Sequence, residues 1–266
     1  FIISDMGMIR LIQKHFPHAN LHLSTQANCI NREAVKVYSD LGFSRIVLGR
    51  EASLDDIRQI KDVNPKMELE VFAHGAMCIA YSGRCLLSAY MTGRSANSGF
   101  CSHSCRWDYK LLEEKERPGE YFPVYEGDDF TEILSSKDIC MIDHLDDMKK
   151  AGVDSLKIEG RMKSLYYAAL VTRSYRKAID ALDGKITIEE AAPYIDELYK
   201  TNHREFATGF FYSQADANKT TRGETKSEWE LAGTIGSALT LTESEALFEK
   251  AQSQKKAFEK ELDEMH

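Results

Sequence analysis

The stretch RIVLGREASLDDIRQIKDVNPKMELEVFAH, residues 45–74, contains one complete strand–helix–strand unit. RIVL at 45–48 is a short apolar run, and MELEVFAH at 67–74 alternates apolar with polar side chains, so we expect both to be strands. Between them, Ser53 can cap a helix over 53–61, and the two aspartates in its first turn suit the helix dipole. A helix that connects two strands in this way predicts a parallel pair.

The same alternation extends along the first two-thirds of the chain. We expect six strands, at 1–4, 20–25, 45–48, 67–74, 133–136 and 153–159. Helices are expected at 8–16, 32–41, 53–61, 143–151, 163–182 and 186–199. Such βα units, repeated at roughly 20–25 residues, favour a TIM-barrel-like α/β fold, a (β/α)₈ barrel.

Two points qualify the barrel. Eight strands are needed, so we expect about two N-terminal units to be missing from this chain. The alternative is a six-stranded doubly wound sheet, which is disfavoured because no Gly-rich phosphate fingerprint follows any strand.

The composition suggests three regions. We expect the partial barrel over residues 1–200, with a Cys-rich insertion at about 75–110, followed by an irregular polar extension over 201–235. Residues 236–266 are rich in Glu, Lys and Ala at helical spacing, and Thr242 with Glu245 forms a capping box, so a charged helical tail is expected. Gly236 is also a plausible junction to a foreign segment.

Length and charge exclude several classes of protein. The chain has 266 residues, of which 43% are hydrophobic, so it can bury a core without disulfides. Its net charge of −8 argues against coating nucleic acid non-specifically, although a local basic patch remains compatible with it. No apolar run reaches about 18 residues and no signal peptide is recognisable, so we expect a cytoplasmic protein with no membrane partner.

The cysteines gather in one segment. Four of the six follow the spacing Cys78-x6-Cys85-x15-Cys101-x3-Cys105, and Cys140 comes later. This pattern has no tight C-x2-C knuckle, unlike zinc ribbons and ferredoxins. Thiolates from separate loops can still converge, and soft sulfur ligands select zinc, copper(I) or iron–sulfur clusters. Inert buried thiols, or a catalytic or redox thiol, are the alternatives.

The placement of this segment is informative. It follows the strand at 67–74, at the end of the strands where barrel enzymes build their sites. Arg84 and Arg106 each lie beside a cysteine and can donate to an anionic cluster or substrate. A surface ion pair explains either arginine equally well.

Five motifs occur in a distinctive order: STQAN (24–28), ELEVFAHGAMCIAYSGRCLLS (68–88), SGFCSHSCRW (98–107), LSSKDIC (134–140) and GVDSLKIEGRMKSLYYAALVTRSYRKAID (152–180). Together they resemble the collagenase-like peptidase family, peptidase family U32, over residues 1–235. The family is named for a proposed protease activity. Its better-understood branches modify RNA or quinones, and one is required for 5-hydroxyuridine at the tRNA wobble position, drawing on prephenate.

The resemblance also implies a [4Fe–4S] cluster and a ligand set. The matching positions are Cys78, Cys85, Cys101 and Cys140, with Cys105 as a rival fourth ligand. Zinc is the alternative metal. The tRNA branch of the family ends in a small β-rich domain after a motif like LAGTI (231–235), whereas a Glu/Lys/Ala-rich segment follows here.

The motif KIEGR places further candidates at a strand end. We expect Lys157 and Arg161 to hold a dicarboxylate such as prephenate, and Glu159 to orient them or to move a proton. Arg84 and His74 complete the expected catalytic set. A structural ion-pair cluster at the barrel mouth is the alternative interpretation.

Other polar residues are expected to bind substrate. They lie after the second strand, on the cysteine-bearing strand or among the cysteines: His22, Gln26, Asn28, Glu70 and Arg106. The aromatic residues Tyr81, Tyr90 and Trp107 can stack on a base or serve as packing residues.

The leading hypothesis is therefore an iron–sulfur-dependent hydroxylase that acts on a wobble uridine of tRNA, or on another structured RNA, with a prephenate-like donor. A peptidase is the first alternative, although neither HExxH nor GxSxG occurs in the sequence. The second alternative is a non-catalytic half of a heteromeric hydroxylase with a paralogous protein partner.

Overall fold

A computed structural model describes most of the first 213 residues. The described residues are 1–107 apart from Ile79 and Gly99, 125–126, 131–132, and 136–213 apart from Met162. The chain divides into two compact units, Phe1–Glu228 and Trp229–His266. The second unit lies outside the described residues, and so does the helical tail predicted at 236–266.

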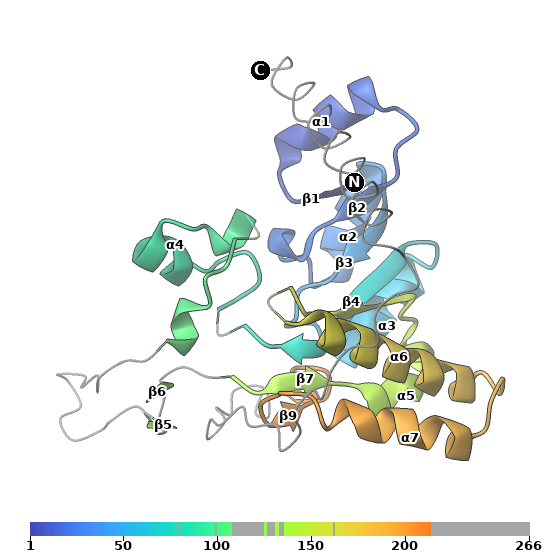
Figure 1. Cartoon of the computed structure of the whole chain (residues 1–266). Coiled ribbons are helices and arrows are strands. Elements are labelled where there is room, and N and C mark those ends of the chain that lie inside the picture. Colours follow the sequence, from blue (N-terminus) through green and yellow to red (C-terminus); the bar gives the residue numbers. More distant parts are fainter. Residues whose placement is uncertain are drawn as a thin grey trace, which may run out of the picture. The chain divides into compact units, whose positions relative to one another are not determined.

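Parallel strands connected by helices form the body of the first unit (Figure 1). Strands β1 (Ile2–Ile3), β2 (Leu21–Leu23), β3 (Phe43–Val47) and β4 (Glu68–Ala76) pair in the order of the sequence. Strand β8 (Ser155–Ile158) then pairs parallel with β4. The connecting helices are α1 (Met6–His15), α2 (Arg32–Asp40) and α3 (Leu54–Val63).

This strand order distinguishes between the two expected architectures, a (β/α)₈ barrel and a doubly wound sheet. In a doubly wound sheet the order reverses at a switch point, whereas these five parallel strands follow one another without reversal. A mixed α/β fold with a parallel sheet, as predicted, is therefore confirmed. Closure into a barrel is not seen within the described part of the chain.

The prediction of a parallel strand at 133–136 is wrong in its direction and position. Residues 133–135 lie outside the described residues, and the strand that follows them, β7 (Asp138–Cys140), runs antiparallel to β4 instead of parallel. Strand β3 pairs with β4 only as far as Glu70, and β7 pairs with β4 beyond that point, from His74 to Ala76. β7 also pairs with β9 (Phe206–Ala207), while β5 (Tyr125–Glu126) and β6 (Thr131–Glu132) form a separate pair.

Helix α3 illustrates why the helices form where they do. The Ser53 hydroxyl accepts a hydrogen bond from the Asp56 N–H, and the Asp56 carboxylate accepts one from the Ser53 N–H, which completes a capping box. Ile57 and Ile60 are fully buried on one side of this helix. Later helices use the same kind of hydroxyl cap, on α6 (Leu165–Leu182) and α7 (Ile188–Leu198); α5 (Leu145–Ala151) does not.

The hydrophobic core lies between the sheet and these helices. On β4, Leu69, Val71 and Ala73 are buried in alternation, and they belong to the same core as Ile57 and Ile60. Successive strand residues point to opposite faces, so Glu70 and Phe72 lie on the other face of the sheet. No described helix combines the length and the apolar character that crossing a membrane requires.

Candidate functional site

One cavity lies at the carboxyl ends of the parallel strands. It has a volume of about 540 Å³. Its walls include Gln26 after β2, Arg50 after β3, Ala76 on β4, and Lys157 and Glu159 at the end of β8. Parallel strands end at a common edge, which explains why residues so distant in sequence meet there.

Four thiols line this cavity: Cys78, Cys85, Cys101 and Cys105. Cys140 does not line it. Because β7 is antiparallel, Cys140 pairs with His74, two positions before the end of β4 at Ala76. Burial raises the pKa of the Cys140 thiol to about 11, although hydrogen bonds to the thiol from the Ile142 backbone and the Tyr175 hydroxyl act to lower it. Of the two candidates for fourth ligand, Cys105 therefore lines the same cavity as Cys78, Cys85 and Cys101, and Cys140 does not.

The thiols suit a soft metal in type but are not gathered around one point. Within the described residues, no group of three or more His, Cys, Asp or Glu side chains is close enough to hold a metal ion. Cys78 is solvent-exposed, yet protein atoms crowd its thiol, and this desolvation raises its pKa, which Arg50 lowers and Cys85 and Cys101 raise further. Metal binding would have to deprotonate these thiols and draw them together. The sulfur donor set fits zinc or an iron–sulfur cluster.

The first turn of the Cys-rich segment, residues 75–107, contacts the edge of the sheet through a close backbone approach and hydrogen bonds. Gly83 adopts a left-handed backbone, and a Cβ there would lie 1.9 Å from the Gln26 carbonyl oxygen. Nearby, the Ser82 N–H donates to the Glu51 carboxylate at 2.7 Å, and the Arg50 N–H donates to the Ser82 hydroxyl at 3.3 Å. The Gln26 amide also donates to the Ala96 carbonyl at 3.4 Å. These contacts place the segment over the ends of β2 and β3.

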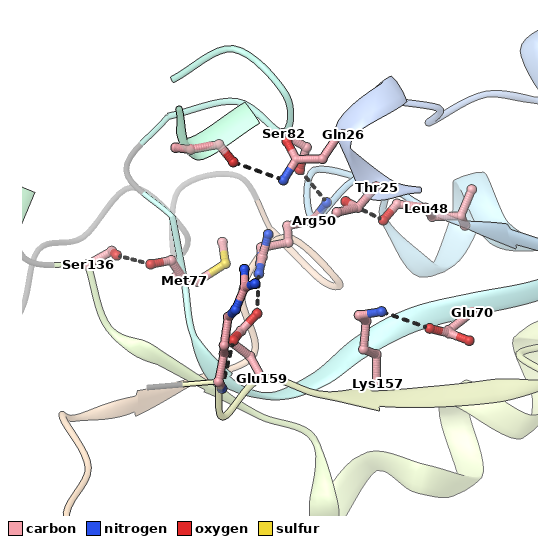
Figure 2. A network of polar contacts seen from close by, with 12 residues as sticks. Thr25, Gln26, Leu48, Arg50, Glu70, Met77, Ser82, Ser136, Lys157 and Glu159 are labelled. Carbon is pink, nitrogen blue, oxygen red and sulfur yellow. Dashed lines mark hydrogen bonds and ion pairs between the residues drawn. The ribbon is translucent and has the colours of Figure 1, made fainter. Parts of the chain in front are cut away.

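Arg50 is the principal residue that sequence reasoning missed. Figure 2 shows its guanidinium reaching toward Glu159, and the Nη2–Oε2 distance is 3.5 Å. Its Cζ also lies 3.6 Å from the centroid of the Phe72 ring, which is a cation–π contact. Arg50 comes two residues after the strand RIVL, much as Arg161 comes three residues after β8, and that position was the available signal.

Lys157 and Glu159 are both held by ion pairs. The Lys157 ammonium lies 3.3 Å from a Glu70 carboxylate oxygen, and Arg45 binds the other oxygen at 3.3 Å (Figure 2 shows the lysine pair). Glu159 accepts from Arg50 and from the Arg161 backbone N–H. Glu70 is absent from the cavity wall and acts on it through Lys157.

Arg161 lines the cavity as predicted from its position after β8. Its Cζ lies 5.8 Å from the centroid of the Phe100 ring, which belongs to the Cys-rich segment. KIEGR therefore contributes Lys157, Glu159 and Arg161 to the cavity that the four cysteines also line.

His74 lies in the core beneath the cavity. It is 1% exposed, packs against the Tyr167, Tyr175 and Phe206 rings, and has Nδ1 3.4 Å from the Tyr175 hydroxyl. Burial lowers its pKa to about 3, with smaller contributions from His203 and Lys163. His74 is therefore neutral at physiological pH.

The remaining polar candidates whose side chains the structure describes are not among the residues that line the first cavity. His22 lines a second cavity, of about 610 Å³, that also includes Arg45 and Lys66, and desolvation lowers its pKa. The Asn28 amide donates to Glu51 at 3.3 Å, and Arg84 is exposed and donates to the Gly83 carbonyl. Neither Asn28 nor Arg84 lines the first cavity. The side chain of Arg106 lies outside the described residues.

Comparison with known proteins gives a consistent set of relatives. The family model described as peptidase family U32 matches residues 1–221. The chain is 40% identical to tRNA hydroxylation protein P of Escherichia coli (strain K12), over 79% of this chain and 54% of that protein. It is 42% identical to tRNA hydroxylation protein P1 of Bacillus subtilis (strain 168), over 79% of this chain and 49% of that protein.

A third relative is named for a different RNA. The chain is 41% identical to a 23S rRNA 5-hydroxycytidine synthase of Escherichia coli (strain K12), over 68% of this chain and 26% of that protein. The chain thus spans about half the length of the first curated relatives that it matches. No solved structure gives a significant match.

Proposed function

Because the chain belongs to peptidase family U32, we propose that it carries the active site of an RNA hydroxylase that acts on a tRNA wobble uridine. One observation carries the proposal: thiols and the KIEGR side chains share a single cavity. Relatives at about 40% identity that are named tRNA hydroxylation proteins support RNA as the substrate. A tRNA substrate also agrees with a cytoplasmic location.

The proposed cofactor is a [4Fe–4S] cluster, with zinc as the alternative. Cys78, Cys85 and Cys101 would supply three thiolates, and Cys140 or Cys105 the fourth. When bound, such a cluster supplies electron transfer or Lewis acidity. The cavity position of Cys105 favours it, whereas the family resemblance favours Cys140.

The proposed donor is a small dicarboxylate such as prephenate. Arg161 offers a planar guanidinium for bidentate binding of a carboxylate, and Lys157 offers a point charge on the same wall. Arg50 orients the Glu159 carboxylate through their ion pair, and Glu159 is the proposed proton acceptor. A donor enclosed between these side chains and the Cys-rich segment would be shielded from water.

We also propose that the parallel strands form part of a (β/α)₈ barrel. Their sequential order and the position of the cavity support it. The whole protein's activity, its donor and any paralogous partner belong to this proposal too, because the chain spans only about half the length of these relatives.

The first test is metal analysis of protein purified without oxygen. About four irons per chain with a brown chromophore are expected for a [4Fe–4S] centre. Single replacements Cys105→Ser and Cys140→Ser then identify the fourth ligand, because only one of them should bleach the colour. A colourless protein, or one that holds zinc alone, would contradict the cluster.

The second test measures the modified nucleoside. Cells that lack the native gene are complemented with the wild type, Cys78→Ser or Arg161→Gln, and their tRNA is digested for mass spectrometry. We expect 5-hydroxyuridine with the wild type alone, while all three proteins unfold at similar urea concentrations. Normal hydroxylation with either variant would rule out the assigned roles.

A peptidase is the other candidate, suggested by the name of the family. A cysteine nucleophile requires a depressed pKa, whereas burial raises the pKa of Cys140 to about 11 and desolvation raises that of Cys78. Gelatin incubated with metal-stripped protein should remain intact. Cleavage that disappears in Cys78→Ser would reverse the assignment.

The non-catalytic half of a heteromeric hydroxylase is tested by co-purification. A tagged wild-type chain that retains hydroxylation activity only together with a paralogue would support this arrangement.

A further inference from the structure

The Cys-rich segment differs in charge from the rest of the molecule. Residues 75–107 contain Arg84, Arg94 and Arg106 and no Asp or Glu, although the whole chain has a net charge of −8. A cationic segment in an acidic protein is a local electrostatic site for an anionic partner.

Large aromatic side chains of the same segment are exposed. Tyr90 on α4 (Leu87–Thr92) is 86% exposed, Tyr81 68% and Phe100 57%, and Trp107 is also exposed. Isolated exposed apolar residues are ordinary, but four rings within 27 residues of one loop segment are concentrated enough to indicate a binding surface.

The rings and the cations meet at the cavity. Tyr81, Phe100 and Arg94 all line it, and Arg161 lies over the Phe100 ring. Arg84 and Arg94 are exposed, and no acidic side chain among the described residues pairs with either. The cationic and aromatic surface is therefore continuous with the site that holds the thiols.

We infer that the Cys-rich segment is a platform for single-stranded RNA, on which Tyr81, Tyr90 and Phe100 stack with unpaired bases and Arg84 and Arg94 contact phosphates. Aromatic rings bind any base face, and adjacent cations follow the backbone. The inference deepens the proposed function and rests on its RNA substrate: one unpaired base can enter the cavity while its neighbours remain on the rim. A protein partner would need acidic side chains to match these arginines.

The experiment measures RNA binding, not hydroxylation. Fluorescence anisotropy follows the full chain binding to a labelled anticodon stem–loop and to a duplex of equal length. We expect the stem–loop to bind more tightly. Tyr90→Leu should weaken it about 10-fold, whereas Tyr90→Phe, which keeps the ring, should bind like the wild type.

The charge contribution has its own control. Arg84→Gln with Arg94→Gln should reduce the slope of log K against log[salt] by about 1.4, as two phosphate contacts to a single strand require. Arg176→Gln removes an equally positive, exposed side chain on α6, where it pairs with Asp180, and should leave the slope unchanged.

Three results would contradict the proposed RNA platform. The first is equal affinity of the protein for duplex and stem–loop, and the second is wild-type affinity of the Tyr90→Leu variant for the stem–loop. The third is a protein dimer in sedimentation that Tyr90→Leu dissociates. The last result would assign the surface to a second copy of the chain. Failure of the proposed function is distinguishable, because it would leave stem–loop binding and its Tyr90 dependence intact while no hydroxylated nucleoside forms.

Discussion

At the scale of single residues, the attachment of the Cys-rich segment depends on one glycine. Gly83 combines a φ of +73° with a contact so close that a Cβ would overlap the Gln26 carbonyl. The Gln26 oxygen belongs to backbone that is fixed by the turn after β2, so it cannot yield easily. The turn at Gly83 thus sets the distance between the cysteines and the sheet.

We predict that Gly83→Ala displaces the segment from the sheet edge. The matched control is Gly93→Ala, where φ is +71° but nothing lies within 4 Å of an added Cβ. Both variants share the left-handed strain of about 1 kcal/mol, and only the first has the clash. Limited proteolysis should cut Gly83→Ala faster near residues 80–86; equal rates for the two variants would contradict the role of the close contact.

Arg50 provides a second prediction at this scale. Arg50→Gln removes the cation that pairs with Glu159 and stacks on Phe72, so the carboxylate loses a fixed orientation. Loss of one charge-assisted contact should lower hydroxylation about 10- to 100-fold. Arg58→Gln, on the exposed face of α3, is the control and should keep full activity. Equal activity of both variants would remove Arg50 from the site.

His74 makes a prediction about pH. Its pKa is about 3 in the folded protein, below the ordinary value of 6.5, so the unfolded chain binds a proton that the folded chain does not. The free energy of unfolding therefore falls as pH falls from 6.5 toward 3. Between pH 7 and pH 5 the contribution is about 2 kcal/mol.

Urea unfolding of metal-free protein at pH 7 and pH 5 measures this contribution. His74→Phe removes the titrating group, so its loss of stability over the same interval should be smaller by that amount. An identical loss in the wild type and the variant would show that His74 does not titrate on unfolding.

At the scale of elements, local chemistry predicts boundaries well. Ser53 and the aspartates after it specify where α3 begins, and the structure has the capping box at that residue. Strand direction is different, because an alternating pattern is the same in either direction. Nothing in the sequence near Asp138 indicates that β7 would run antiparallel, since its place is set by β4 and by the buried ion pair of Asp138 with Arg204.

The cap of α3 can be tested directly. Ser53→Ala removes the acceptor for the Asp56 N–H and should lower the free energy of unfolding by about 1 kcal/mol. Ser53→Thr retains both the acceptor and the hydroxyl that donates to the Asp56 carboxylate, and should restore most of the loss. If urea unfolding finds the two variants equally destabilised, the hydroxyl has another role.

At the scale of the whole molecule, β4 connects the parts of the fold. It pairs with β3 at its start, β8 in its middle and β7 at its end. Helix α4, in contrast, has six residues, and only Ser88 among them is buried. Protection should therefore be unequal along the chain.

We predict this inequality in hydrogen exchange followed by mass spectrometry. Peptides that cover 68–76 should exchange only on global unfolding, whereas peptides that cover 87–98 should exchange through local opening. If Cys85 and Cys101 ligate a metal as proposed, adding it should slow exchange at 87–98, because the two ends of this stretch would then be held together. Equal protection of both regions in metal-free protein would contradict the prediction.

The candidate site was predictable only where its residues are marked by a motif. KIEGR and the clustered cysteines are recognisable in sequence, and Lys157, Glu159, Arg161 and Cys78 do line one cavity. Arg50 was missed because it belongs to no motif, and its position after a strand is a weak signal by itself. His74 was expected among the catalytic residues because alternation identifies its face of β4 but not its depth beneath Tyr167 and Tyr175.

The ion pair of Arg50 and Glu159 joins residues that are 109 positions apart. A ribosome that adds about 5–20 residues per second takes roughly 5–20 s to pass from one to the other. The codons for Cys78, Cys85, Cys101 and Cys105 are all read within this interval. The nascent chain therefore presents its thiols to cellular oxidants before the KIEGR side chains that share their cavity have been synthesised.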